Sequence, residues 1–221
     1  MRARFGLFAG FTLAIGALLA GCIGGTAAPT SGPGGIPASC PKTAPAHAKA
    51  GTTATATIAT PKGTIVIALK ADLGPAAVGN FIELAKCGYY DGVVFQRLVA
   101  GFVIQGGDGG YGRVPNVNVN RVGSGKPGYT IDDDPVLTPY KRGTVAMARS
   151  SQPHSEDTQF FIVLDDSAAG SLSTANTYAI MGSVTSGMEV VDAIAGMATH
   201  GPNGDIADNP VPMTSVTITT P

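Results

Sequence analysis

Short runs of β-branched, aromatic and aliphatic residues alternate with stretches rich in Gly, Pro and Asn over the last three quarters of the chain. This alternation is typical of a domain built from short strands that are joined by turns. We therefore expect one domain over 55–221, which is long enough to bury one substantial core. Its eight expected strands are Thr55–Thr60, Thr64–Leu69, Val93–Leu98, Phe102–Gln105, Thr144–Ala148, Gln159–Leu164, Tyr178–Val184 and Val216–Thr219.

Two segments of the same domain show helical spacing instead. The first begins near Pro75, carries its apolar residues on one stripe and ends near Lys86. In the second, Ser186 and Glu189 have the spacing of a capping box, and Gly196 ends the helix. Eight strands with only two helices exclude an alternating βαβ sheet. They favour an antiparallel sandwich or a closed barrel with helices over its ends.

The expected strand 159–164 is apolar on both of its faces. Side chains alternate across a strand, so Gln159 and Phe161 share one face while Phe160 and Ile162 share the other. An apolar face that also carries a polar group is typical of a binding pocket. The strand is therefore predicted to fill a core with one face and to line a pocket with the other.

Arg97 lies inside the apolar run 93–105. A guanidinium in such a run is costly unless it pairs with an anion, faces a cleft or acts on a ligand. An ordinary arginine on the surface of a strand edge is the alternative. The second apolar face of strand 159–164 favours the cleft.

The first residues of the chain have the pattern of an export signal. Two arginines within 1–4 precede a weakly polar to apolar run, and small residues follow it. Residues 19–22, Leu-Ala-Gly-Cys, resemble the box at which bacterial lipoproteins are cleaved and acylated on the cysteine. We expect a signal peptide over 1–21, a lipid on Cys22 and an extracytoplasmic, membrane-anchored protein on the periplasmic or outer face. A plain signal peptide, or a single anchor helix with an incidental cysteine, is the alternative.

The segment 22–54 is expected to be a disordered tether. Of the 32 residues in 23–54, 26 are Gly, Pro, Ala, Ser or Thr, and no apolar periodicity runs through them. Such a segment cannot bury enough surface to offset its ordering entropy. Outside the cytoplasm, Cys40 in the tether could form a disulfide with Cys87 at the end of the first helix. Two free thiols are the alternative.

Composition argues against several classes of protein. Lys and Arg number 14 against 15 Asp and Glu, and only 13% of residues are charged, so there is no basic excess for nucleic-acid binding. The three cysteines form no CxxC pair and no Cys/His cluster, which excludes a zinc ribbon or a disulfide-dense miniature fold. We expect neither a nucleic-acid partner nor a structural metal.

Three stretches have partial signals for nucleotide or metal binding, and each fails a further requirement. Residues 107–112 satisfy GxGxxG but no helix can open after them, and residues 123–127 have proline where a phosphate loop needs Ser or Thr. Asp132–Asp134 lacks the spacing of a calcium loop and is expected to form a solvated turn. In the domain only His154 and His200 could act as a base, both in Gly/Pro-rich loops, so a hydrolase or metalloenzyme is poorly supported.

Two stretches resemble the signature motifs of the cyclophilins, a family of peptidyl-prolyl cis-trans isomerases. Residues 95–108, FQRLVAGFVIQGGD, are similar to the family pattern F-[HQ]-R-x-x-x-G-F-x-x-Q-G-G-D. Met147-Ala148-Arg149, followed by Ser155 and then by QFFI at 159–162, is similar to the second pattern. The similarity extends over about 55–219, and the two motifs stand in the family's order.

The resemblance implies a fold and a set of functional residues. The fold is an eight-stranded antiparallel closed β-barrel capped by two α-helices. Arg97, with Gln105 and Phe102, would act in catalysis. The residues that would bind substrate are Val103, Ala148, Arg149, Gln159, Phe161, Leu172 and Tyr178. No cofactor and no metal are implied.

Several positions depart from the best-known family pattern. Val103 stands where methionine is usual, and Tyr178 stands at a position often held by histidine. Ser171 takes the place of the indole that contacts cyclosporin, which implies weak cyclosporin binding. The loop 112–122 has the character of an insertion beside the active face.

The resemblance implies a monomeric isomerase domain that accelerates rotation of Xaa-Pro bonds in exported, proline-containing polypeptides. A binding module or holdase that grips proline-containing segments with little catalysis is the alternative. The arginine at 97 favours the enzyme.

Overall fold

The computed structural model describes residues 35–175 and 177–221. The expected signal peptide over 1–21, Cys22 and the first part of the expected tether lie outside the described residues. Within the described part, no helix is both long and apolar enough to cross a bilayer. The elements are β1 Thr53–Thr60, β2 Gly63–Lys70, α1 Pro75–Lys86, β3 Val94–Val99, β4 Val103–Gly106, β5 Thr144–Met147, β6 Phe160–Val163, α2 Ala168–Ala175, β7 Ile180–Ser186, α3 Met188–Ala195, β8 Thr199–His200, β9 Ile206–Pro212 and β10 Ser215–Thr219.

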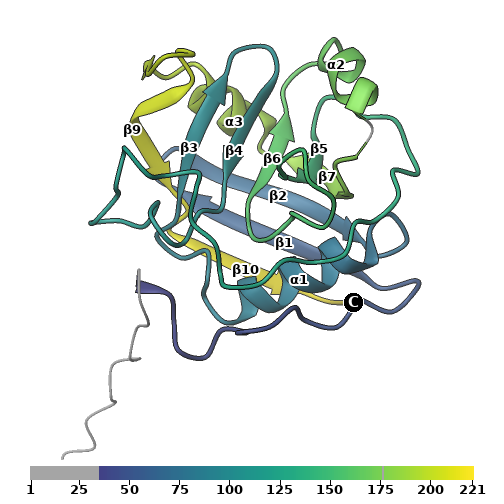
Figure 1. Cartoon of the computed structure of the whole chain (residues 1–221). Coiled ribbons are helices and arrows are strands. Elements are labelled where there is room, and N and C mark those ends of the chain that lie inside the picture. Colours follow the sequence, from purple (N-terminus) through teal and green to yellow (C-terminus); the bar gives the residue numbers. More distant parts are fainter. Residues whose placement is uncertain (1–34, 176) are drawn as a thin grey trace, which may run out of the picture.

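The strands form one antiparallel barrel (Figure 1). Their order is β10-β1-β2-β7-β5-β6-β4-β3-β9-β8. β9 pairs with β3 and β10 pairs with β1, and only Met213 and Thr214 separate these two strands. Met213 donates its N–H to Val93 O (2.8 Å), and Thr214 donates to Ala59 O (2.7 Å). β9 and β10 therefore act as one bent strand that joins the two ends of the sheet, and the predicted eight-stranded closed barrel is confirmed.

The barrel interior is the main apolar core. Its largest fully buried side chains include Phe81, Phe95 and Phe160. Phe160 meets the rings of Phe81 and Tyr90 edge-on, with centroids 5.4 and 5.7 Å apart. Offset and edge-to-face pairs of this kind add to the stabilisation from burial. The aromatic cluster therefore fixes how α1, which carries Phe81, sits on the barrel.

Both predicted helices are present: Pro75 stands in the first turn of α1 as predicted, whereas the amino end of α3 differs from the prediction. Asp134 accepts the N–H of Ala76 (3.2 Å) and of Ala77 (2.8 Å), so a buried carboxylate caps α1. The expectation of a solvated turn is therefore wrong for Asp134. Gly187, at φ 91°, is the N-cap of α3 in place of the predicted Ser186. A Cβ at Gly187 would lie 2.2 Å from Thr64 O, so this close approach of two backbones needs glycine.

Three elements were not expected from the sequence. α2 buries only Ala168 and Leu172, so it lacks a continuous apolar stripe. β8 is two residues long, and β9 contains Pro210 and Pro212, which are rare in strands because proline cannot donate to a ladder. The prediction of two helices is thus corrected to three, with the short α2 lying above β5 and β6 in Figure 1.

Residues 35–52, here called the N-terminal strap, pack on the domain. A disulfide joins Cys40 to Cys87, with the Cα atoms 5.1 Å apart, and this confirms the proposed bridge. Ala48 donates its N–H to Pro75 O (2.9 Å). A Cβ at Gly79 would lie 2.5 Å from Ala46 O, so the strap crosses α1 in close contact. The strap has almost no regular structure, as expected, yet it differs from a free tether because the disulfide and α1 hold it.

Candidate active site

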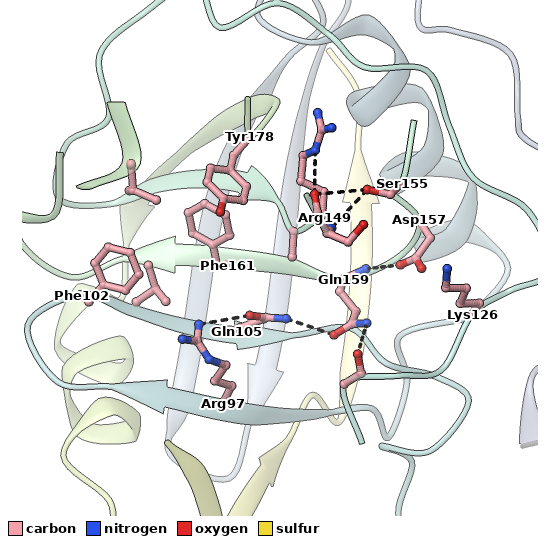
Figure 2. A pocket seen from close by; sticks show the side chains of 15 residues that line it. Arg97, Phe102, Gln105, Lys126, Arg149, Ser155, Asp157, Gln159, Phe161 and Tyr178 are labelled. Carbon is pink, nitrogen blue, oxygen red and sulfur yellow. Dashed lines mark hydrogen bonds between the residues drawn. The ribbon is translucent and has the colours of Figure 1, made fainter. Parts of the chain in front are cut away.

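A pocket of about 400 Å³ opens on the outer surface of the barrel, beside β3, β4 and β6 (Figure 2). Arg97 comes from β3, and Leu172 comes from α2. All ten residues predicted for catalysis or substrate binding line this one pocket: Arg97, Phe102, Val103, Gln105, Ala148, Arg149, Gln159, Phe161, Leu172 and Tyr178. The fold thus brings together residues that are up to 81 positions apart in the chain.

The floor of the pocket is apolar. Val103, Phe161 and Leu172 belong to a second cluster of buried residues, outside the barrel core, and Phe102 and Tyr178 pack against it. The rings of Phe161 and Tyr178 meet edge-on with centroids 5.4 Å apart. This floor can accept a small apolar ring.

The predicted division of strand 159–164 between two faces is confirmed. Phe160 and Ile162 belong to the barrel core. Phe161 and Val163 belong to the cluster beneath the pocket. β6 is therefore the wall that the core and the pocket share.

A line of polar side chains borders the floor. Arg97 donates from Nε to Asp205 Oδ2 (2.8 Å) and from Nη1 to Gln105 Oε1 in a long hydrogen bond of 3.5 Å. Gln105 Nε2 donates to Gln159 Oε1 (3.1 Å), and Gln159 Nε2 donates to Gly123 O (3.0 Å). Figure 2 shows Arg97, Gln105 and Gln159 in this row beside Phe102 and Phe161. The guanidinium therefore lies on the same side of the barrel as both phenylalanines, at the rim of an open slot.

Arg149 borders the pocket, but its guanidinium is bound to the protein. The side chain is only 6% exposed and pairs with Asp133 Oδ1 at 3.0 Å. It also donates to the carbonyl oxygens of Gln152 (2.7 Å) and Thr177 (3.3 Å). The backbone around Arg149 is thus the part of this residue that is free to meet a ligand.

The far end of the pocket contains residues that the sequence analysis did not select: Gly123, Lys126, Ser150, Ser155 and Asp157. Gly123 and Lys126 belong to the stretch 123–127, whose sequence resembles a phosphate loop but fails its requirements and so predicts no role in this pocket. Ser155 was part of the second motif, but no role was assigned to it. Asp157 had no local signal, because its place depends on how the loop before β6 folds back.

Asp108 explains how the loop beside the pocket holds its shape. Its carboxylate is fully buried and accepts the backbone N–H groups of Gly110 (2.9 Å), Tyr111 (3.0 Å), Gly123 (2.6 Å) and Gly125 (2.9 Å). Such a set of donors satisfies a buried carboxylate. The glycine-rich stretch 107–112 is therefore a structural loop that positions Gly123 at the pocket.

Two buried carboxyl groups belong to the loop before β6: Asp157 lines the far end of the pocket, and its neighbour Glu156 does not line it. Burial is the main cause that raises the pKa of Asp157, although its carboxylate accepts two backbone N–H groups. Glu156 is fully buried and accepts one N–H, from Ala179 at 3.0 Å. Burial raises the pKa of Glu156 to about 8, and the nearby carboxylate of Asp133 adds to the increase.

Glu156→Gln is expected to flatten the pH dependence of stability between about pH 4.5 and 8. The native pKa of Glu156 is raised, so the native protein keeps a proton that the unfolded chain releases over this window. The stabilisation that comes from this retained proton is fully present below pH 4.5 and is lost as the pH rises through 8. One pKa unit corresponds to about 1.4 kcal/mol, so the loss is on the order of 5 kcal/mol.

Urea denaturation at pH 5 and pH 9 measures this effect. The wild type and Glu156→Gln should have similar free energies of unfolding at pH 5, and the variant should be the more stable at pH 9. Glu83→Gln is the matched control, because Glu83 is an exposed residue paired with Lys86. An equal pH dependence in the wild type and Glu156→Gln would contradict the prediction.

The described residues contain no group of three or more His, Cys, Asp or Glu side chains that could hold a metal ion. His154 and His200 do not line the pocket. His200 instead lies 2.6 Å from Asp208 on the surface. The residues that do line the pocket include hydrogen-bonding side chains, such as Arg97 and Gln105, and apolar ones, such as Phe161.

Comparison with known proteins identifies the family. The profile of the family described as cyclophilin type peptidyl-prolyl cis-trans isomerase/CLD matches residues 55–220. A probable peptidyl-prolyl cis-trans isomerase of Brucella abortus is 36% identical over 155 residues, which are 65% of this chain and 77% of that protein. Peptidyl-prolyl cis-trans isomerase B of Escherichia coli is 34% identical over 168 residues, which are 73% of this chain and 98% of that protein.

Solved structures show the same fold. The crystal structure of a cyclophilin type peptidyl-prolyl cis-trans isomerase of Cryptosporidium parvum superposes with a TM-score of 0.62 at 23% identity. The match covers 76% of this chain and 99% of that chain. The barrel and its helices are thus shared well beyond the signature motifs.

Proposed function

This chain belongs to the cyclophilin-type peptidyl-prolyl cis-trans isomerases, and on that premise we propose that it rotates Xaa-Pro bonds by holding the twisted amide with Arg97. The enzyme class follows from the family and its named relatives. The role of Arg97 and the cellular setting do not follow from the family alone and are proposed here.

Rotation about an Xaa-Pro bond needs no bond to break. The bond resists rotation because the nitrogen shares its lone pair with the carbonyl, which gives a barrier of roughly 18–20 kcal/mol. In the twisted state this conjugation is lost, and the nitrogen lone pair can accept a hydrogen bond. A donor that meets the nitrogen only in the twisted state lowers the barrier, because it binds the transition state better than either planar isomer.

The pocket supplies both parts of such a catalyst. Phe102, Phe161 and Leu172 offer an apolar slot for the proline ring. Arg97 stands at its rim and directs its Nη groups toward Gln105 and the slot (Figure 2). The position of a guanidinium beside an open apolar slot is the single observation that carries the proposal. Gln105 would orient Arg97 and, with Gln159, bind the backbone of the substrate.

Exchange NMR with an Ala-Pro peptide tests the activity directly. The protein is expected to accelerate interconversion between the cis and trans signals of the peptide. A binding module or holdase would shift the peptide lines without any acceleration, and that result would contradict the proposal.

For the cellular setting, we propose an exported lipoprotein that is anchored through Cys22 and acts on proline-containing exported chains. The sequence of 1–22 supports this proposal. So does the disulfide between Cys40 and Cys87, because disulfides persist outside the reducing cytoplasm. Mass spectrometry of the native amino terminus should find a diacylated cysteine; an unmodified Cys22 would contradict the anchor.

Weak binding of cyclosporin is also proposed. Ser171 is exposed on α2, where the resemblance places an indole that contacts the drug. Ser171→Trp is expected to lower the inhibition constant of cyclosporin about tenfold, which corresponds to ~1.4 kcal/mol of binding free energy. Ser173→Trp, at another exposed position of α2, is the control and should change nothing. Equal inhibition of the wild type and Ser171→Trp would contradict this prediction.

A further inference from the structure

Asp205 is the acidic residue that holds Arg97. It lies in the turn between β8 and β9, which is 108 positions from Arg97 in the sequence. Its Oδ2 accepts the hydrogen bond from Arg97 Nε at 2.8 Å. Among the ion pairs formed by the described residues, this is the one that includes a residue of the polar row in the pocket.

The fold holds Asp205 in place from its backbone. Asp205 O accepts the N–H of Leu98, the residue after Arg97, at 2.8 Å. In the ladder between β3 and β9, Arg97 pairs with Ile206, the residue after Asp205. The Asp205 side chain is only 14% exposed. The pairing of β3 with β9 therefore fixes the backbone at Asp205, and the low exposure of the side chain restricts where its carboxylate can lie.

Arg97 is much freer than its partner. Its side chain is 38% exposed, and its one other hydrogen bond to a described residue, to Gln105, is long at 3.5 Å. Fixing a free arginine side chain in one geometry costs roughly 2 kcal/mol of conformational entropy. The bond at Nε fixes the plane of the guanidinium and leaves both Nη groups for other partners.

We propose that Asp205 is a positioning residue for the isomerase reaction: it keeps the Arg97 guanidinium turned toward the proline slot before substrate arrives. This inference rests on the role proposed above for Arg97. It adds a residue from the turn between β8 and β9 to a site that draws on β3, β4, β6, α2 and the loops between them. Preorganisation of a donor helps the transition state more than it helps binding of the planar substrate.

The ion pair itself should contribute little to folding stability. The Arg97 side of the pair is 38% exposed, so water screens the pair, and ion pairs that reach solvent are commonly worth about 1 kcal/mol or less. Removal of Asp205 should therefore change the kinetics without a comparable loss of stability. A residue that serves only the fold would show the opposite pattern.

Four variants of the full chain test the proposal by exchange NMR with an Ala-Pro peptide. Asp205→Ala should lower kcat about tenfold with little change in KM, because a donor that acts in the transition state is no longer held. Asp205→Asn keeps an acceptor for Nε and should retain activity within about threefold of the wild type. Asp208→Ala removes a nearby carboxylate that pairs with His200, and it should leave the activity unchanged. Arg97→Lys is measured beside them.

The NMR signal of Arg97 Nε–H gives a readout that folding alone would not move. Slow exchange with water is expected in the wild type and in Asp205→Asn, and fast exchange in Asp205→Ala. Because Asp205 acts through Arg97, Asp205→Ala should cost nothing further when it is added to Arg97→Lys. If Asp205→Ala does not fold, the comparison of Asp205→Asn with the wild type, in activity and in Nε–H exchange, decides the matter.

The outcomes separate this inference from the proposed mechanism. Full activity of Asp205→Ala, together with an inactive Arg97→Lys, would overturn the role of Asp205 alone. Full activity of Arg97→Lys would overturn the mechanism and the positioning role with it. A loss in Asp205→Asn equal to that in Asp205→Ala would also overturn the inference, because the retained acceptor would then have no effect.

Discussion

Arg97→Lys is expected to lower kcat/KM for an Ala-Pro peptide on the order of 100-fold, which is the usual effect of removing one preorganised donor from a transition state. A lysine ammonium keeps the charge but loses the planar fork. It cannot donate to Asp205 with one nitrogen and keep two others directed at the slot, as Arg97 does from Nε and its Nη groups.

The fold should survive this substitution, because the Arg97 side chain is 38% exposed and fills no core. The thermal unfolding temperature of Arg97→Lys should therefore remain near that of the wild type. Arg121→Lys is the matched control, since Arg121 lies over the Tyr111 ring at 4.0 Å and does not line the pocket. Exchange NMR measures all three proteins, and wild-type activity in Arg97→Lys would remove Arg97 from the mechanism.

Replacing both Cys40 and Cys87 with serine is expected to lower the free energy of unfolding by about 4 kcal/mol, because the bond closes a loop of 47 residues in the unfolded chain. The strap would also lose its fixed point beside α1. Its remaining contacts include the hydrogen bond from Ala48 to Pro75 O and the packing of Ile36 and Ala48 against the core.

Activity of the folded variant should be retained. The strap crosses α1, whereas the pocket is lined from β3, β4, β6 and α2, and Figure 1 shows the strap and α2 at opposite ends of the view. Urea denaturation with and without dithiothreitol measures the effect. The reductant should destabilise the wild type and leave the double-serine variant unchanged; equal midpoints for both proteins without reductant would contradict the prediction.

Local patterns were enough for most of the barrel. Alternation along 159–164 predicted correctly that Phe160 faces the core and that Phe161 faces a pocket. Pro75 and the apolar stripe after it located α1. These predictions succeeded because burial repeats every two residues along a strand and every 3.6 residues along a helix. The repeat is therefore visible in residues that are close together in the sequence.

Contacts between residues far apart in the sequence left no periodic pattern from which they could be predicted. Asp134 caps α1 from 57 and 58 positions away, and Asp205 reaches Arg97 across 108. In the sequence, Asp134 was only one of three consecutive acids, and Asp205 was one residue in a glycine-rich turn. β9 was missed for a related reason: its prolines argue against a strand, and pairing with β3 overrides that preference.

The sequence by itself therefore determined eight of the ten strands and two of the three helices. Through its resemblance to the cyclophilins, it also determined ten of the 15 residues that line the pocket. Only the tertiary structure decided how the barrel closes at Met213 and Thr214, how the strap lies on α1 and which carboxylate holds Arg97. The physical reason is that periodic burial leaves a trace in adjacent residues. A hydrogen bond or an ion pair between distant segments forms only where the whole fold brings its two atoms together. The residues next to each partner in the sequence therefore give no sign of the contact.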